Sequence, residues 1–92
     1  MMTESTNYML NSLKVDLGIT TTAYDDRLIE YLNSATKYIE TEGISLQDTI
    51  DDNNLVIMYA SWLWQKRKEN IGMPKMLRWA LNNRLFAEKT NG

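Results

Sequence analysis

The sequence LVIMYASWLW at residues 55–64 decides the fold, because only Ser61 interrupts its run of apolar side chains. Ten residues make almost three turns of a helix, so apolar side chains cover every side of it. A helix of this kind lies at the centre of a fold or is covered by a partner. The run is far shorter than the roughly 18 residues that cross a membrane. We therefore expect a buried central helix over residues 51–70 of a soluble protein.

Signals on both sides of this run mark where the helix begins and ends. Thr49 and Asp52 form a pair that resembles a capping box. Cations at residues 66–68 complement the negative end of the helix dipole. Pro74 then suits the first position of another helix, over residues 74–88, where its missing N–H costs nothing. The apolar face that we expect for this last helix consists of Met76, Leu77, Ala80, Leu81 and Leu85.

Two further helices are expected before the central one. The first covers residues 5–17, and Gly18 follows in the position of a left-handed C-terminal cap. The second covers residues 23–42, with Thr22 and Asp25 as another pair that resembles a capping box. Its apolar residues repeat at four, three and four positions, which predicts a narrow seam for packing on another helix. They are Leu28, Leu32, Ala35 and Ile39.

The composition agrees with helices in one domain. Eleven Leu and six Met stand against two Val, which favours helix over sheet. A chain of 92 residues buries only about 60–65% of its unfolded surface, so one modest core is available. No repeat or linker divides the sequence. We expect an all-α domain over residues 1–92, a small bundle of four helices with frayed ends at residues 1–4 and 90–92.

The sequence argues against catalysis and metal binding. It has no Cys and no His, and it contains no P-loop, dinucleotide fingerprint or nucleophile elbow. Paired carboxylates at residues 25–26 and 51–52 could suggest acid–base chemistry or a hard-metal site. Both pairs lie at predicted helix starts, where capping and the helix dipole account for them. We expect no enzyme activity, no cofactor and no metal.

The net charge of −2 conceals two oppositely charged halves. Residues 1–55 hold ten acids and three bases, a net charge of −7, whereas residues 56–92 hold two acids and seven bases, a net charge of +5. The halves could neutralise each other within one molecule. The basic half could instead bind nucleic acid, or it could meet the acidic half of a second copy in a head-to-tail assembly. The sequence alone favours neutralisation within one molecule, and the other two stay open as alternatives.

The tryptophans add a hint of an interface. Trp62 and Trp64 lie about 200° apart on the central helix, so one small core cannot easily cover both. Trp79 lies off the line of Leu77 and Leu81. We expect at least one Trp at a rim or an interface, where Trp is enriched. A core that includes all three stays open as the alternative.

The chain resembles the head–tail connector, or adaptor, proteins of long-tailed bacteriophages. The resemblance covers about residues 10–89, and its most specific part is MPKMLRxALNNRL at residues 73–85. The other matching positions are LKVDLG at residues 13–18, then Asp26, Leu28, Ile29, Leu32 and Ala35, and in the third helix Val56, Tyr59, Ala60 and Ser61 leading to Arg67.

This resemblance implies a structural protein of the virion neck, made in the host bacterial cytoplasm. Members of the family form a ring on the portal after DNA packaging and extend the DNA channel. The implied partners are therefore the portal protein, further copies of this chain in a ring that we expect to be dodecameric, and the next neck or tail-completion protein. DNA is expected to pass through the lumen without sequence-specific binding, and no membrane is involved.

The resemblance and the tryptophan pattern also predict which residues face a neighbouring subunit or the portal. Adjacent asparagines at residues 82–83 are poor helix formers, which suggests that they serve a contact; a solvated helix face stays open as the alternative. The expected interface residues are Arg67, Lys68, Arg78, Trp79, Asn82, Asn83 and Arg84. The alternative function is a small helical DNA-binding module that uses the basic fourth helix, and an interaction domain of a host protein comes third.

Overall fold

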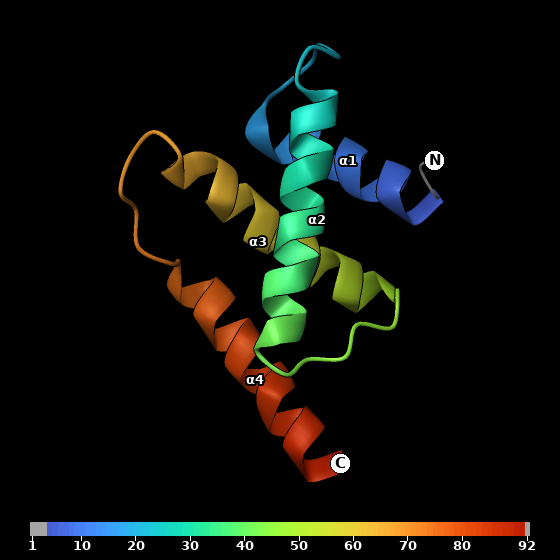
Figure 1. The fold of residues 1–92 in the computed structure, drawn as a ribbon, viewed down its shortest axis with the longest axis vertical. Coiled ribbons are helices and arrows are strands. Elements are labelled where there is room, and N and C mark those ends of the chain that lie inside the picture. Colours follow the sequence, from blue (N-terminus) through green and yellow to red (C-terminus); the bar gives the residue numbers. More distant parts are fainter. Residues whose placement is uncertain (1–3, 92) are drawn as a thin grey trace.

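Four α-helices account for most of residues 4–91, the part of the chain that the structure, a computed structural model, describes. In chain order they are α1 (Glu4–Leu17), α2 (Asp25–Thr41), α3 (Ile50–Lys66) and α4 (Lys75–Asn91). No strand occurs within residues 4–91. The predicted all-α class and the four helices are confirmed. The helices cross one another instead of running parallel, and α2 lies across α3 (Figure 1).

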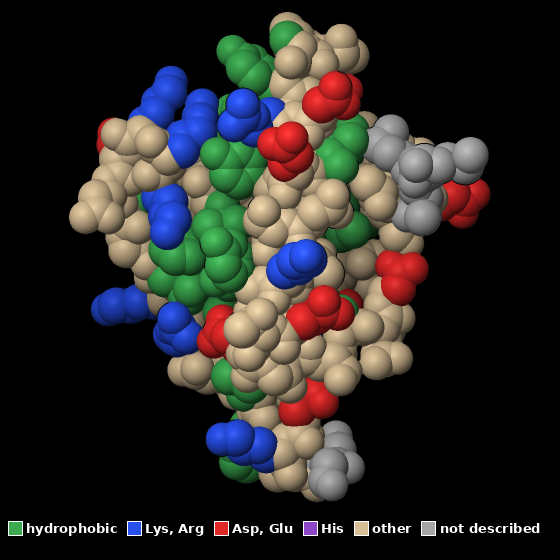
Figure 2. Space-filling model, in the orientation of Figure 1, with side chains coloured by type: hydrophobic (Ala, Val, Ile, Leu, Met, Phe, Trp, Pro, Cys, Tyr) green, Lys and Arg blue, Asp and Glu red, His purple; other side chains and the backbone are tan. Residues whose placement is uncertain are grey.

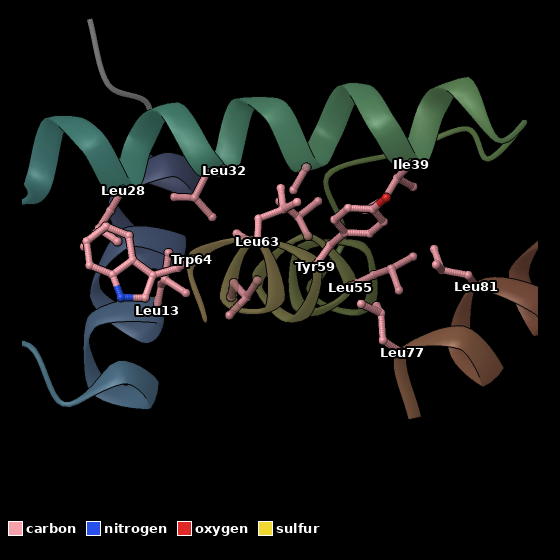
Figure 3. Close-up of a cluster of buried hydrophobic side chains, with 14 of the residues drawn as sticks. Leu13, Leu28, Leu32, Ile39, Leu55, Tyr59, Leu63, Trp64, Leu77 and Leu81 are labelled. Carbon is pink, nitrogen blue, oxygen red and sulfur yellow. The ribbon is translucent and has the colours of Figure 1, made fainter. Parts of the chain in front are cut away.

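The core forms around α3, as its run of apolar side chains predicts. This helix packs against α1, α2 and α4. Leu55, Tyr59 and Leu63 of α3 are buried, and Figure 3 shows them between side chains of α2 on one side and Leu77 and Leu81 of α4 on another. The predicted seam of α2 is also confirmed, since all four of its residues, Leu28, Leu32, Ala35 and Ile39, are buried.

The start of α2 differs from the sequence-based expectation. The predicted N-cap at Thr22 is wrong, because α2 begins at Asp25 after Tyr24, and no side chain caps it. The carbonyl of Thr22 accepts the amide hydrogen of Asp25 at 3.2 Å instead. Asp25 instead forms an ion pair with another helix, since its carboxylate lies 2.8 Å from the ammonium group of Lys14 in α1. A contact between two helices has therefore replaced the expected local cap.

The link between α3 and α4 is longer than expected. The central helix ends at Lys66, four residues before the predicted end, and Arg67 caps it. The guanidinium of Arg67 donates a hydrogen bond of 2.7 Å to the carbonyl of Trp64. Pro74 immediately precedes α4, and its carbonyl accepts the amide hydrogen of Arg78 at 3.0 Å, so it occupies the N-cap and not the first helical position.

The core-facing side of α4 is largely as predicted. Leu77 and Leu81 are buried, and Ala80 and Leu85 are partly buried against the core. Met76 was the exception among the five expected residues: its side chain is 74% exposed, so its assignment to the core is wrong. The helical residues also extend to Glu4 and Asn91, into the ends that the sequence predicts to be frayed. The rest of those ends, residues 1–3 and 92, lie outside the described residues.

Candidate interaction surface

The exposed side of α4 carries a second set of apolar side chains. Met76, Trp79 and Phe86 are 74%, 69% and 70% exposed. With Asn83 they repeat at intervals of three and four residues, which places all four on one side of the helix. We call this set the outer face of α4. Such a stripe, on a helix whose opposite side is already packed, is typical of a surface that a partner covers.

Lys75, Asn82 and Lys89 flank the outer face along one edge. All three are exposed, and at 3.6 residues per turn they line up beside Trp79 and Phe86. Neither lysine forms an ion pair with any of the described residues. The edge of the outer face is therefore positively charged and free to meet carboxylates.

Arg84, another expected interface residue, has a role inside the subunit. Its guanidinium donates to the carboxylate of Asp52 at the start of α3, and it also donates to the carbonyl of Ser45 at 3.2 Å. Glu88 lies 3.7 Å from the same guanidinium and accepts the amide hydrogen of Ser45 at 3.0 Å. These contacts fasten α4 to the loop between α2 and α3.

Asp52 is the buried partner of this network. Thr49 accepts the amide hydrogen of Asp52 at 3.1 Å, which confirms the predicted cap, but the carboxylate of Asp52 receives the amide hydrogen of Gln47. Burial raises the pKa of this carboxyl; the hydrogen bonds from Gln47 and Arg84 and the charge of Arg84 oppose it, and the net pKa is lowered. The carboxylate therefore stays ionised and holds the network together.

Two other predicted residues also have internal contacts. Arg78 lies 3.6 Å from Glu42 at the end of α2. Arg67 lies with its guanidinium carbon 3.6 Å from the centre of the Trp64 ring, in a cation–π contact. Lys68 is exposed and has no ion pair among residues 4–91. Of the seven predicted residues, four are exposed on α4, two are exposed just beyond the end of α3, and Arg84 is partly buried. The four are Arg78, Trp79, Asn82 and Asn83, and the two are Arg67 and Lys68.

The tryptophans separate into three environments. Trp64 is buried, with the rings of Tyr24 and Tyr31 each 5.6 Å away in edge-on contacts. Trp62 is partly buried and donates its indole hydrogen to the carbonyl of Ile71 at 3.0 Å. Trp79 is exposed, so the alternative of three core tryptophans is wrong. Sequence reasoning missed Phe86 and misplaced Met76, although their spacing from Trp79 is a signal for a second helix face.

A second exposed apolar site lies where α1 and α3 begin. Its depression has a volume of about 320 Å³ and is lined by Glu4, Ser5, Tyr8, Ile50 and Asn53. Ile50 is 71% exposed and Tyr8 is 44% exposed. Asp48 is exposed beside the depression, and its carboxylate accepts the hydroxyl hydrogen of Ser5 at 2.9 Å. We call this site, with its apolar floor and acidic rim, the acidic corner. Sequence reasoning did not find it because it joins two distant segments, with Ser5 and Asp48 43 positions apart.

The opposite charges of the two halves of the sequence remain separated in space. Figure 2 shows basic side chains gathered mainly along the side of the molecule where α4 begins and acidic side chains mainly along the other side, with exposed hydrophobic side chains between them. Arg84–Asp52 and Arg78–Glu42 are the ion pairs that join the basic half to the acidic half within residues 4–91. Internal neutralisation thus accounts for only part of the asymmetry.

Comparison with known proteins returned nothing to which this chain can be assigned. No protein-family model, no curated protein and no solved structure matches it. Within residues 4–91 there is no cluster of three or more side chains suited to hold a metal ion. No helix in the same range has the length and apolarity needed to cross a membrane.

Proposed function

We propose that this protein is a structural subunit that works by docking, specifically a head–tail connector of a long-tailed bacteriophage. The observation that carries this proposal is the outer face of α4, an apolar stripe that the subunit itself leaves uncovered. A protein that acts alone gains nothing from exposing Trp79 and Phe86 to water, since their burial is favourable. The resemblance of residues 73–85 to phage adaptors supplies the particular class.

Assembly fits the polar groups of the subunit better than catalysis does. Asp52 is the buried charged side chain among the described residues, and its carboxylate already accepts hydrogen bonds from Arg84 and from the amide of Gln47. A catalytic acid or base needs a free position facing a substrate. The contacts of Asp52 are instead those of a group that fixes the position of α4.

In the proposed role, copies of the chain form a ring on the portal protein and extend the channel through which DNA passes. The next neck or tail-completion protein docks on the other side of the ring, and the protein resides in the virion neck. The separation of charge over the subunit supports a heterologous contact between neighbours, because such a contact brings together two different surfaces.

The structure does not favour the alternative, a DNA-binding module that reads with α4. The outer face of that helix is apolar, and Arg78 and Arg84 are engaged by carboxylates. A DNA-reading helix presents cations and amides to phosphates and base edges. Only Lys75 and Lys89 remain on α4 as unpaired cations among the described residues.

Co-sedimentation with portal rings from the same phage tests the proposal. We expect the protein to pellet with the rings and to be present in purified virions. If it stays in the supernatant at the highest concentration and virions lack it, the proposal is wrong. A gel shift with duplex DNA at low salt addresses the alternative, since DNA binding that weakens steeply with added salt would support a nucleic-acid-binding module.

Lys68→Glu is the sharper variant for this assay. Because Lys68 is exposed and has no ion pair within residues 4–91, its reversal is expected to weaken portal co-sedimentation without changing the thermal midpoint. Arg67→Glu is less suitable, because it also removes the contact with Trp64 and the hydrogen bond at the end of α3. Unchanged co-sedimentation of the Lys68 variant would show that this side chain takes no part in the contact.

A further inference from the structure

The outer face of α4 needs an occupant, and the charges of the helix restrict which one fits. Lys75, Arg78, Arg84 and Lys89 stand against the single acid Glu88, so α4 is strongly basic. A symmetric pair would place two such helices side by side and bring like charges together. The favoured occupant therefore combines an apolar surface with carboxylates.

The acidic corner of the same chain has both properties. Ile50 and Tyr8 give it an apolar floor, and the depression of about 320 Å³ is large enough to receive an aromatic side chain. Glu4 lines it, and Asp48 lies beside it, because the hydroxyl of Ser5 in the lining donates to the Asp48 carboxylate at 2.9 Å. Both acids are exposed and form no ion pair with other described residues. Apolar surface would meet apolar surface, and the lysines would meet the carboxylates at the rim.

The two sites lie apart in the subunit. Figure 1 shows the beginnings of α1 and α3 on one side of the molecule and α4 along the other side. One copy thus cannot fill its own acidic corner with its own outer face. A contact between two different surfaces on separate sides of a subunit is heterologous, and its repetition closes a ring or extends a filament.

We propose that the outer face of α4 docks into the acidic corner of a second copy of this chain. Trp79 or Phe86 enters the depression beside Ile50, and Lys75 and Lys89 approach Glu4 and Asp48. The proposal deepens the proposed function and rests on it for a biological role, since it identifies the surfaces that join ring subunits. Its physical claim concerns this chain alone and can be tested without the portal.

The absence of Cys from the chain allows a direct test by engineered disulfides. Asn83→Cys places a thiol on the outer face, between Trp79 and Phe86, and Asn53→Cys places one in the acidic corner. The two variants are mixed at high concentration and oxidised, and intact mass distinguishes mixed from self-linked dimers. We expect mixed dimers to dominate. Val15→Cys, exposed elsewhere on α1, replaces Asn53→Cys in the control mixture.

Each outcome decides the proposal. Preferential linking of Asn83→Cys to itself would overturn it in favour of symmetric pairing of α4, and a mixed yield no higher than that of the control would overturn it altogether. Adding Trp79→Ala and Phe86→Ala to the Asn83→Cys chain is expected to weaken the association about thirtyfold and remove the mixed product. If the protein co-sediments with portal rings but forms no mixed dimers, the connector role is supported and the proposed contact is wrong. If mixed dimers form but the protein does not bind portal rings, the contact is supported and the connector role is wrong.

Discussion

At the scale of single residues, Asp52 and Arg84 do most to fix the position of α4. Their ion pair joins residues 32 positions apart, and Asp52 is almost completely buried. Arg84→Ala leaves that carboxylate without its counter-ion, and we expect a loss of about 2–3 kcal/mol in the free energy of unfolding, less than for a fully buried pair because Arg84 is partly exposed. Urea unfolding measures the loss, with Lys89→Ala as a control. Equal stability of the two variants would refute the structural role of Arg84.

The same pair makes stability depend on pH in a defined direction. The pKa of Asp52 in the folded state lies below its ordinary value of 3.8. Its stabilising contribution is therefore complete above that value and is lost as the pH falls through the folded-state pKa. Asp52→Asn should be less stable than the natural chain near neutral pH, and the gap in the free energy of unfolding should narrow on acidification to about pH 2.5. A gap that stays constant over this range would contradict the assignment.

How far the sequence predicts individual contacts depends on their range. The cap of α3 by Thr49 was predictable, because donor and acceptor are three residues apart on one turn. The pairing of Asp52 with Arg84 was not, because it depends on how α4 crosses the start of α3. The failed cap at Thr22 has the same origin, since Asp25 pairs with Lys14 of another helix instead of completing a local cap.

At the scale of elements, α4 has two apolar faces, one packed in the core and one exposed. Leu81 is fully buried against the core, whereas Trp79 and Phe86 are exposed. Leu81→Ala is expected to lower the free energy of unfolding by about 2–4 kcal/mol. The double variant Trp79→Ala, Phe86→Ala removes far more apolar surface but is expected to change it by less than about 0.5 kcal/mol, because surface substitutions cost little. Thermal unfolding of the monomer at low concentration compares them.

A strong destabilisation by the double variant would mean that the outer face is covered inside the subunit, and the proposal that a partner docks there would then be wrong.

The sequence indicated only one of the two apolar faces of α4. The leucines at residues 77, 81 and 85 repeat every four residues and dominate the pattern. The sequence analysis therefore assigned Met76 to the same face. Which of two apolar stripes is buried depends on the direction from which α3 approaches, and that direction is a property of the whole fold.

At the scale of the whole molecule, the separation of charge is the feature that sequence and structure share. The division into halves of −7 and +5 is visible along the chain, but it could have been cancelled by folding the halves together. Within residues 4–91, the fold joins the two halves by ion pairs only at Arg78–Glu42 and Arg84–Asp52. The unpaired lysines beside the outer face and the carboxylates of the acidic corner are left on separate surfaces, which is what a head-to-tail contact requires.

Reversing the charges of one of these surfaces should weaken the contact, and reversing those of the other as well should restore it. Lys75→Glu with Lys89→Glu should weaken self-association, measured by sedimentation over a concentration series, because glutamates would then face the carboxylates of the acidic corner. Mixing this variant with a Glu4→Lys, Asp48→Lys chain should restore association, since the two rims become complementary again. The restored contact, like that of the natural chain, should weaken as salt is added, because rim charges are screened within about 10 Å at 0.1 M salt.

The control variant, Arg27→Glu with Lys37→Glu, applies the same change in net charge to α2 and is expected to leave association unchanged. If this control weakens association equally, net charge and not the proposed pair of surfaces governs it.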